Sequence, residues 1–150
     1  MADLRRTLTA CGAADVRTHL QSGNAVLTLP GDRDAVTALV RTAVEDLGVG
    51  CDVVARTGAE LAGLVARLPW PDRAAGDPAR LHVGFLSAPG DGVAKSVGPG
   101  EEVRFDGSHV WVWYGDGAGR SKLGLDVGDR VLTMRNWRTV TALAAMASAE

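Results

Sequence analysis

The chain has 150 residues, 46% of them hydrophobic and 23% charged, an ordinary globular composition that excludes a disordered or fibrous protein. The length fits one domain, or two small subdomains with a shared core. The net charge of −2 gives no reason to expect a nucleic-acid or membrane partner. No apolar run approaches the roughly 20 residues that a membrane span needs.

The cysteines indicate a reducing environment. Cys11 and Cys51 are far apart in the sequence and belong to no C-x-x-C pair, and no secretory signal opens the chain. We therefore expect a cytoplasmic protein in which both thiols are free and buried.

The first half of the sequence alternates helices and strands. A helix is expected over residues 3–11, and strand character follows over 16–29, interrupted by a polar quartet at 21–24 that predicts a bulge or turn. Asp32 is placed to cap an amphipathic helix that continues to Leu47. A short strand is expected over 51–55.

A capping box predicts the start of the next helix: the side chains of Thr57 and Glu60 are each expected to accept a hydrogen bond from the other residue's backbone N–H group. It ends at the Pro-Trp-Pro sequence of residues 69–71.

The second half predicts a hairpin. Residues 81–87 read as a buried strand and 88–100 as a loop. Residues 103–105 and 109–114 read as two strands joined by Asp106-Gly107, a turn dipeptide. A short strand at 131–133 leads to Asn136, which can cap a last amphipathic helix.

These elements favour an α+β fold with mixed, largely antiparallel sheets and helices on one face, arranged as two ferredoxin-like subdomains. Residues 1–72 are assigned to an N-terminal α/β subdomain, 73–79 to a connector, and 80–150 to a C-terminal α+β subdomain.

The best candidate for a ligand site follows the second hairpin strand. Glycines from Gly115 to Gly119 precede Arg120, Ser121 and Lys122. Glycine lets backbone N–H groups converge on an anion, and Arg, Ser and Lys are donors that bind phosphate or carboxylate. The spacing fits neither a P-loop nor G-x-G-x-x-G, so a solvated loop remains the alternative.

Arg135, Asn136 and Trp137 could form the opposite wall of the same pocket. The competing interpretation is an N-cap beside a core tryptophan. The stretch from 120 to 138 holds five basic and two acidic residues on an otherwise acidic chain. Lys122 also stands out because arginine is the usual cation here.

Gln21, Ser22 and Asn24 could present hydrogen-bonding groups to a ligand, or could satisfy a bulge. The histidines, at 19, 82 and 109, have no metal-ligand spacing, so we predict no metal site. No cofactor and no catalytic residue can be assigned.

Three segments together resemble the bacterial family called domain of unknown function 1697. They are VRTHLQSGNAV at 16–26, GRSKL at 119–123 and TMRNWRTV at 133–140. The resemblance implies an α+β fold of two subdomains and no established activity or cofactor. Members of that family usually begin with an apolar strand, whereas this chain begins inside the following helix. The resemblance therefore implies a sheet without its first strand, through a late assigned start, a truncation, or a strand from another chain.

Three functional hypotheses follow. The first is a domain that binds a small anionic ligand, for instance a phosphorylated one. The second is an enzyme acting on a phosphorylated or carboxylated substrate, with Lys122 in a closed cleft where its pKa would be depressed. The third is a protein-interaction module or strand-completed homodimer.

Overall fold

The computed structural model describes residues 2–19, 23–48, 50 and 52–148. It has an α+β fold with antiparallel sheets, as predicted. The chain divides into two compact units: unit 1 comprises residues 1–65 and 142–150, and unit 2 comprises 66–141. The connector predicted at 73–79 lies inside unit 2, in α4 (Pro71–Gly76) and a 3-10 turn, η1 (Pro78–Arg80). No described helix has the length and apolar character to cross a bilayer.

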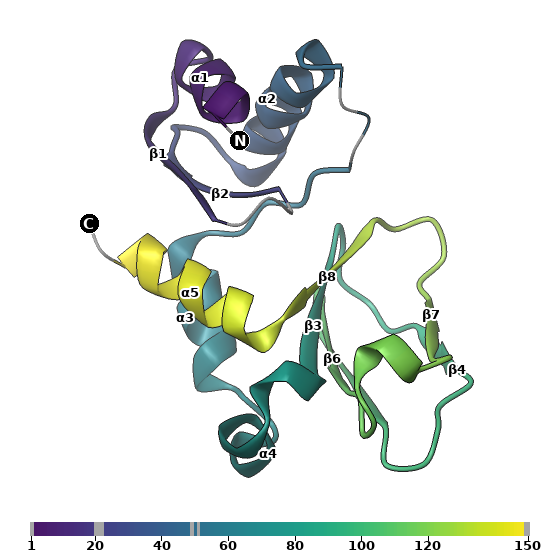
Figure 1. The fold of residues 1–150 in the computed structure, drawn as a ribbon. Coiled ribbons are helices and arrows are strands. Elements are labelled where there is room, and N and C mark those ends of the chain that lie inside the picture. Colours follow the sequence, from purple (N-terminus) through teal and green to yellow (C-terminus); the bar gives the residue numbers. More distant parts are fainter. Residues whose placement is uncertain (1, 20–22, 49, 51, 149–150) are drawn as a thin grey trace. The chain divides into compact units, whose positions relative to one another are not determined.

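Unit 1 is built on a small antiparallel sheet (Figure 1). Strand β1 (Ala14–His19) pairs with β2 (Asn24–Thr28), and helices α1 (Ala2–Ala10) and α2 (Arg33–Asp46) accompany them. Alternate strand residues point to the same face of a sheet. The core forms on one such face and contains Leu8, Ala13, Ala43, Leu4, Cys11, Val16, Leu27, Leu29 and Val40. Cys11 is only partly buried, and Cys51 lies outside the described residues.

The two predicted helix caps of unit 1 are confirmed. The Asp32 carboxylate accepts a hydrogen bond from the Ala35 N–H, at 2.8 Å. Before α3 (Gly58–Ala66), the Thr57 hydroxyl accepts from the Glu60 N–H at 3.1 Å, and the Glu60 carboxylate accepts from the Thr57 N–H at 2.9 Å. Local side chains therefore set these helix starts, as the sequence indicates.

The strand expected at 51–55 is not present over its described part. Residues 52–55 belong to no strand, because no described strand pairs with them. An apolar run with strand propensity becomes a strand only when a neighbouring edge supplies its hydrogen bonds.

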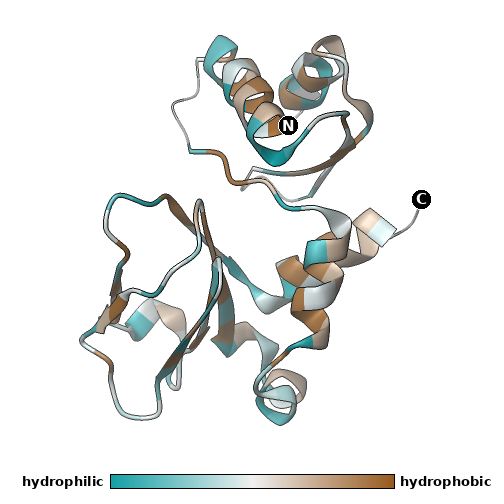
Figure 2. Ribbon diagram, turned by 180° about the vertical axis from the view of Figure 1, so that it is seen from behind, coloured by the Kyte–Doolittle hydropathy of each residue, from teal (hydrophilic) through white to brown (hydrophobic). Residues whose placement is uncertain are grey.

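Unit 2 contains a four-stranded antiparallel sheet of order β5-β6-β3-β8. Its strands are β3 (Leu81–Leu86), β5 (Glu102–Asp106), β6 (His109–Trp113) and β8 (Leu132–Asn136). The predicted hairpin is confirmed, with Asp106 opposite His109 and a positive φ of 61° at Gly107. Figure 2 shows hydrophobic colouring along the central strands of this sheet.

The two faces of this sheet carry different layers. On one face Trp111 is buried, 5.6 Å from the ring of Trp137 in α5 (Trp137–Ser148). On the other face lies Phe105, whose ring is within about 3 Å of where a Cβ on Gly92 would be. Gly92 immediately precedes β4 (Val93–Lys95), which pairs with β7 (Gly124–Asp126) as a separate two-stranded sheet. The helix α5 and the β4–β7 pair therefore belong to opposite faces.

Candidate functional site

The glycine segment begins where β6 ends, and its first half is anchored to the protein. The Tyr114 N–H donates to the Arg80 carbonyl at 2.8 Å, and the Arg80 guanidinium donates to the Gly115 carbonyl. A Cβ on Gly115 would lie 2.8 Å from the Gly100 carbonyl oxygen, so only glycine fits this approach. The first glycine therefore serves backbone packing.

The second half of the segment is exposed. It forms a 3-10 turn, η2 (Ala118–Arg120), and the Arg120 and Lys122 side chains lie in solvent. Neither of these cations forms an ion pair or side-chain hydrogen bond with a described residue. The Ser121 hydroxyl oxygen accepts from the Leu123 N–H at 3.0 Å, which shapes the turn and leaves the hydroxyl hydrogen available as a donor.

Arg135, Asn136 and Trp137 have clear structural roles. The Asn136 side-chain oxygen accepts from the Thr139 N–H at 2.9 Å, which confirms the predicted N-cap of α5. Trp137 is 7% exposed and packs on the sheet. The Arg135 guanidinium donates to the Met134 carbonyl at 2.8 Å.

The two segments predicted to form the pocket, 119–122 and 135–137, lie at or after the ends of strands β6 and β8, and these two strands end on the same side of the sheet. Strands β6 and β8 flank β3 and both run antiparallel to it, with Trp113 opposite Leu81 and Asn136 opposite His82. Their carboxyl ends therefore lie two strand spacings apart, roughly 10 Å. However, α5 packs on the Trp111 face, whereas the chain after β6 leads to β7 on the other face. The exposed cations and the capped helix start thus follow strands that end on the same side of the sheet, and among the described residues no hydrogen bond or ion pair joins Arg120 or Lys122 to the cap.

The structure places two further residues beside this segment, His82 of β3 and Tyr114, which directly follows β6. The His82 ring packs edge-to-face on the Tyr114 ring, with centroids 5.0 Å apart, and its Nδ1 is buried without a hydrogen-bond partner among the described residues. Burial lowers the pKa of His82, and burial together with the charge of Glu101 raises the pKa of Tyr114. Both rings are therefore neutral at pH 7. Only the pairing of β3 with β6 brings them together, which no local motif reveals.

Of the polar quartet near residue 21, Gln21 and Ser22 lie outside the described residues. Asn24 belongs to unit 1, is 7% exposed, and donates from its amide to the His19 carbonyl at 3.1 Å. This bond helps close the turn between β1 and β2, in agreement with the structural interpretation of the quartet.

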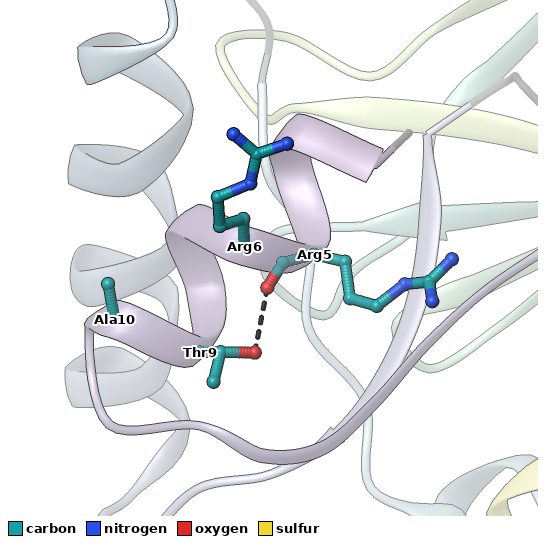
Figure 3. Close-up of a pocket in the computed structure, with 4 residues that line it drawn as sticks. All are labelled: Arg5, Arg6, Thr9 and Ala10. Atoms are coloured by element: carbon teal, nitrogen blue, oxygen red, sulfur yellow. Dashed lines mark hydrogen bonds between the residues drawn. The ribbon is translucent and has the colours of Figure 1, made fainter.

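A separate surface hollow lies along α1 (Figure 3). It is lined by Arg5, Arg6, Thr9 and Ala10, all of them exposed. The Thr9 hydroxyl donates to the Arg5 carbonyl at 2.8 Å, and the two guanidinium groups extend in different directions. Arg6 also pairs with Asp3 at 3.3 Å. The hollow therefore offers no converging donors.

A family model described as a protein of unknown function, DUF1697, matches residues 1–111. The chain belongs to the DUF1697 family. The match confirms the predicted resemblance, and it includes the segment 16–26. It ends before 119–137, so the candidate anion site lies beyond the matched residues. No curated protein and no solved structure matches the chain significantly.

Proposed function

We propose that this DUF1697 protein binds a small anionic ligand through the exposed segment from Gly119 to Lys122. The observation that carries the proposal is how the cations of unit 2 are used. Arg120 and Lys122 are exposed and have no acidic or carbonyl partner among the described residues.

Nearly all the other cations of unit 2 are engaged by the fold. They contact a carboxylate, a backbone carbonyl or an aromatic ring: Arg67 with Asp106, Arg73 with Glu102, Arg80 with Asp77, Lys95 with Asp126, Arg104 with Trp70, Arg130 with Gly90 and Asp91, and Arg135 with Met134. Arg138 is the exception outside the segment.

The segment offers donors of complementary kinds. A guanidinium can hold phosphate or carboxylate through two parallel hydrogen bonds, and an ammonium adds a mobile positive charge. The Ser121 hydroxyl lies between these two cations in sequence. Asp116 is exposed in the same loop and opposes anion binding, so the site favours a ligand with more than one negative charge.

The alternative of an enzyme using Lys122 receives no support from its surroundings. An acid or electrophile role at neutral pH needs an ammonium whose pKa burial or neighbouring cations depress. The Lys122 side chain is exposed. Binding therefore fits the segment better than catalysis does.

The experiment is a titration of the protein with inorganic pyrophosphate at fixed ionic strength. Binding is measured by isothermal calorimetry and by the shift in the melting temperature of the protein. Arg120→Ala and Lys122→Ala are each expected to weaken binding about tenfold, the equivalent of one charge-assisted hydrogen bond. Arg138→Ala is the matched control, because it removes an exposed cation that lies outside the segment and has no ion pair with a described residue. Equal losses in all three variants would reduce the effect to net charge and refute the proposal.

A further inference from the structure

The side chain of His82 lies on the β4–β7 face of the unit 2 sheet. Residues directly opposite each other in antiparallel strands share a face, and His82 is opposite Val112 of β6. Val110, two residues earlier in β6, shares that face and is opposite Phe105. The Phe105 ring identifies this face, because it lies 2.9 Å from where a Cβ on Gly92, next to β4, would be. His82 therefore lies on the face opposite α5.

The segment from 119 to 122 returns to the same face soon after β6 ends. The Gly117 N–H donates to the Tyr114 carbonyl at 3.1 Å, and the Arg120 N–H donates to the Gly117 carbonyl at 3.4 Å. Each such turn brings its first and last Cα atoms within about 7 Å of each other. Figure 1 shows the turn at 118–120 and β7 on the side of the sheet away from the first turn of α5. The arginine side chain can therefore share a bound anion with the sheet end that carries Tyr114 and His82.

The His82 ring has one buried and one accessible nitrogen. Nδ1 is buried without a partner, whereas Nε2 is not buried and makes no hydrogen bond with any residue that the structure describes. A neutral imidazole offers one donor and one acceptor, and a protonated one offers two donors. Nε2 is thus the atom of His82 that can donate a hydrogen bond to a ligand.

No charged side chain of the described residues compensates a positive charge on His82. Burial is the cause of its lowered pKa, with no contribution from a described charged group. The titratable groups of the segments at this sheet end and on this face are Tyr114, Arg80 paired with Asp77 at 2.8 Å, Glu101 bonded to the Gly98 N–H at 2.7 Å, Lys95 paired with Asp126 at 3.4 Å, and the exposed Asp116, Arg120 and Lys122. A protonated His82 therefore needs an anion from solution as its partner.

We propose that His82 is a pH-dependent third contact of the anion site, so that an anion held by Arg120 and Lys122 also accepts a hydrogen bond from protonated His82 Nε2. This inference rests on the proposed function of the segment. The bound anion favours the charged ring, so binding takes up about one proton from solution and tightens as the pH falls. Without an anion the sign is reversed. Because the pKa of His82 is lowered in the folded state, the stability that its neutral form contributes is lost as the pH falls below the unfolded-state pKa of about 6.5.

The first test is isothermal calorimetry with sulfate, whose charge stays constant over the range from about pH 5 to pH 8 in which histidine titrates. In the wild type, binding is expected to be about threefold to tenfold tighter at about pH 5.5 than at about pH 7.5, the equivalent of up to one charge-assisted hydrogen bond. His82→Gln keeps a polar side chain that does not titrate. It should bind equally at both pH values, with the affinity of the wild type at the higher pH.

The second test uses the wild type alone and so does not depend on how well the variant folds. The pKa of His82 is measured by NMR with and without sulfate, after assignment of its signals through the contact with the Tyr114 ring. His109 is the internal control, because it is opposite Phe85 on the other face of the sheet. Sulfate is expected to raise the pKa of His82 and to leave that of His109 unchanged.

The outcomes separate this inference from the proposed function. Sulfate binding with an unmoved His82 pKa would overturn the inference and leave the anion site in place. The same holds if His82→Gln and the wild type depend on pH equally. Absence of both pyrophosphate and sulfate binding at either pH would overturn the anion site, and this inference with it.

Discussion

Substituting alanine for Gly84 tests how the core of unit 2 is packed. Gly84 is buried at the centre of β3, between β6 and β8. A Cβ there would lie 2.4 Å from Val110 Cγ1, 2.7 Å from Leu132 Cδ1 and 2.9 Å from Met134 Sδ. All three distances are shorter than real Cβ contacts, so the neighbouring side chains or the strands must move. Methionine can change rotamer readily, but valine is stiff at χ1 and holds the shortest contact.

We expect Gly84→Ala to lower the free energy of unfolding by about 1–3 kcal/mol, the usual cost of overpacking a core. Val110→Ala alone should cost about 2 kcal/mol, because it removes two buried methyl groups and leaves a cavity. In the double variant the new methyl group occupies part of that cavity. The combined loss should therefore be smaller than the sum of the single losses by about 1–2 kcal/mol.

The assay is equilibrium unfolding in urea of the wild type, the two single variants and the double variant. A coupling energy near zero would refute the reasoning, since it would mean that the Gly84 methyl group and Val110 do not compete for space. An unchanged stability in Gly84→Ala would refute it as well.

Two further predictions concern caps and ion pairs in unit 2. Asn136→Ala should lower stability by about 1–2 kcal/mol in urea unfolding, because the buried Thr139 N–H loses its acceptor, whereas Asn136→Asp should retain the cap; equal losses in both variants would contradict this. Burial opposes ionisation of Asp106, but hydrogen bonds from Trp111 and Arg67 outweigh it and lower its pKa. The resulting stability is present above the unfolded-state pKa of about 3.9 and is lost as the pH falls through the lower folded-state value. Urea midpoints measured from neutral pH to about pH 2 should therefore fall less steeply in Asp106→Asn, by a small amount because the carboxylate is partly exposed; parallel curves would count against it.

The sequence by itself determines the local features of this protein. Asp32, Thr57 with Glu60, and Asn136 mark helix starts, and the structure places a cap at each. Asp106-Gly107 marks the hairpin between β5 and β6. These features depend on interactions between residues a few positions apart, so a short stretch of sequence is enough to predict them.

Tertiary structure alone decides which strands find partners. The residues of β4 lie in the stretch 88–100, which reads as a loop, yet Val93–Lys95 pairs with Gly124–Asp126 across a long separation in sequence. Residues 52–55 read as strand and have no partner. A strand is stabilised by hydrogen bonds to an adjacent strand, and the local sequence does not determine which segment that adjacent strand will be.

The same reason explains the outcome at the candidate site. The sequence identifies Arg120, Ser121 and Lys122 as a group of donors, and the structure leaves both cations exposed and unpaired among the described residues. That Asn136 caps a helix is local, and the sequence predicts it. In the assembled sheet, β6 and β8 end on either side of β3, and α5 and β7 belong to opposite faces. Both facts depend on the strand order, which only the tertiary structure determines.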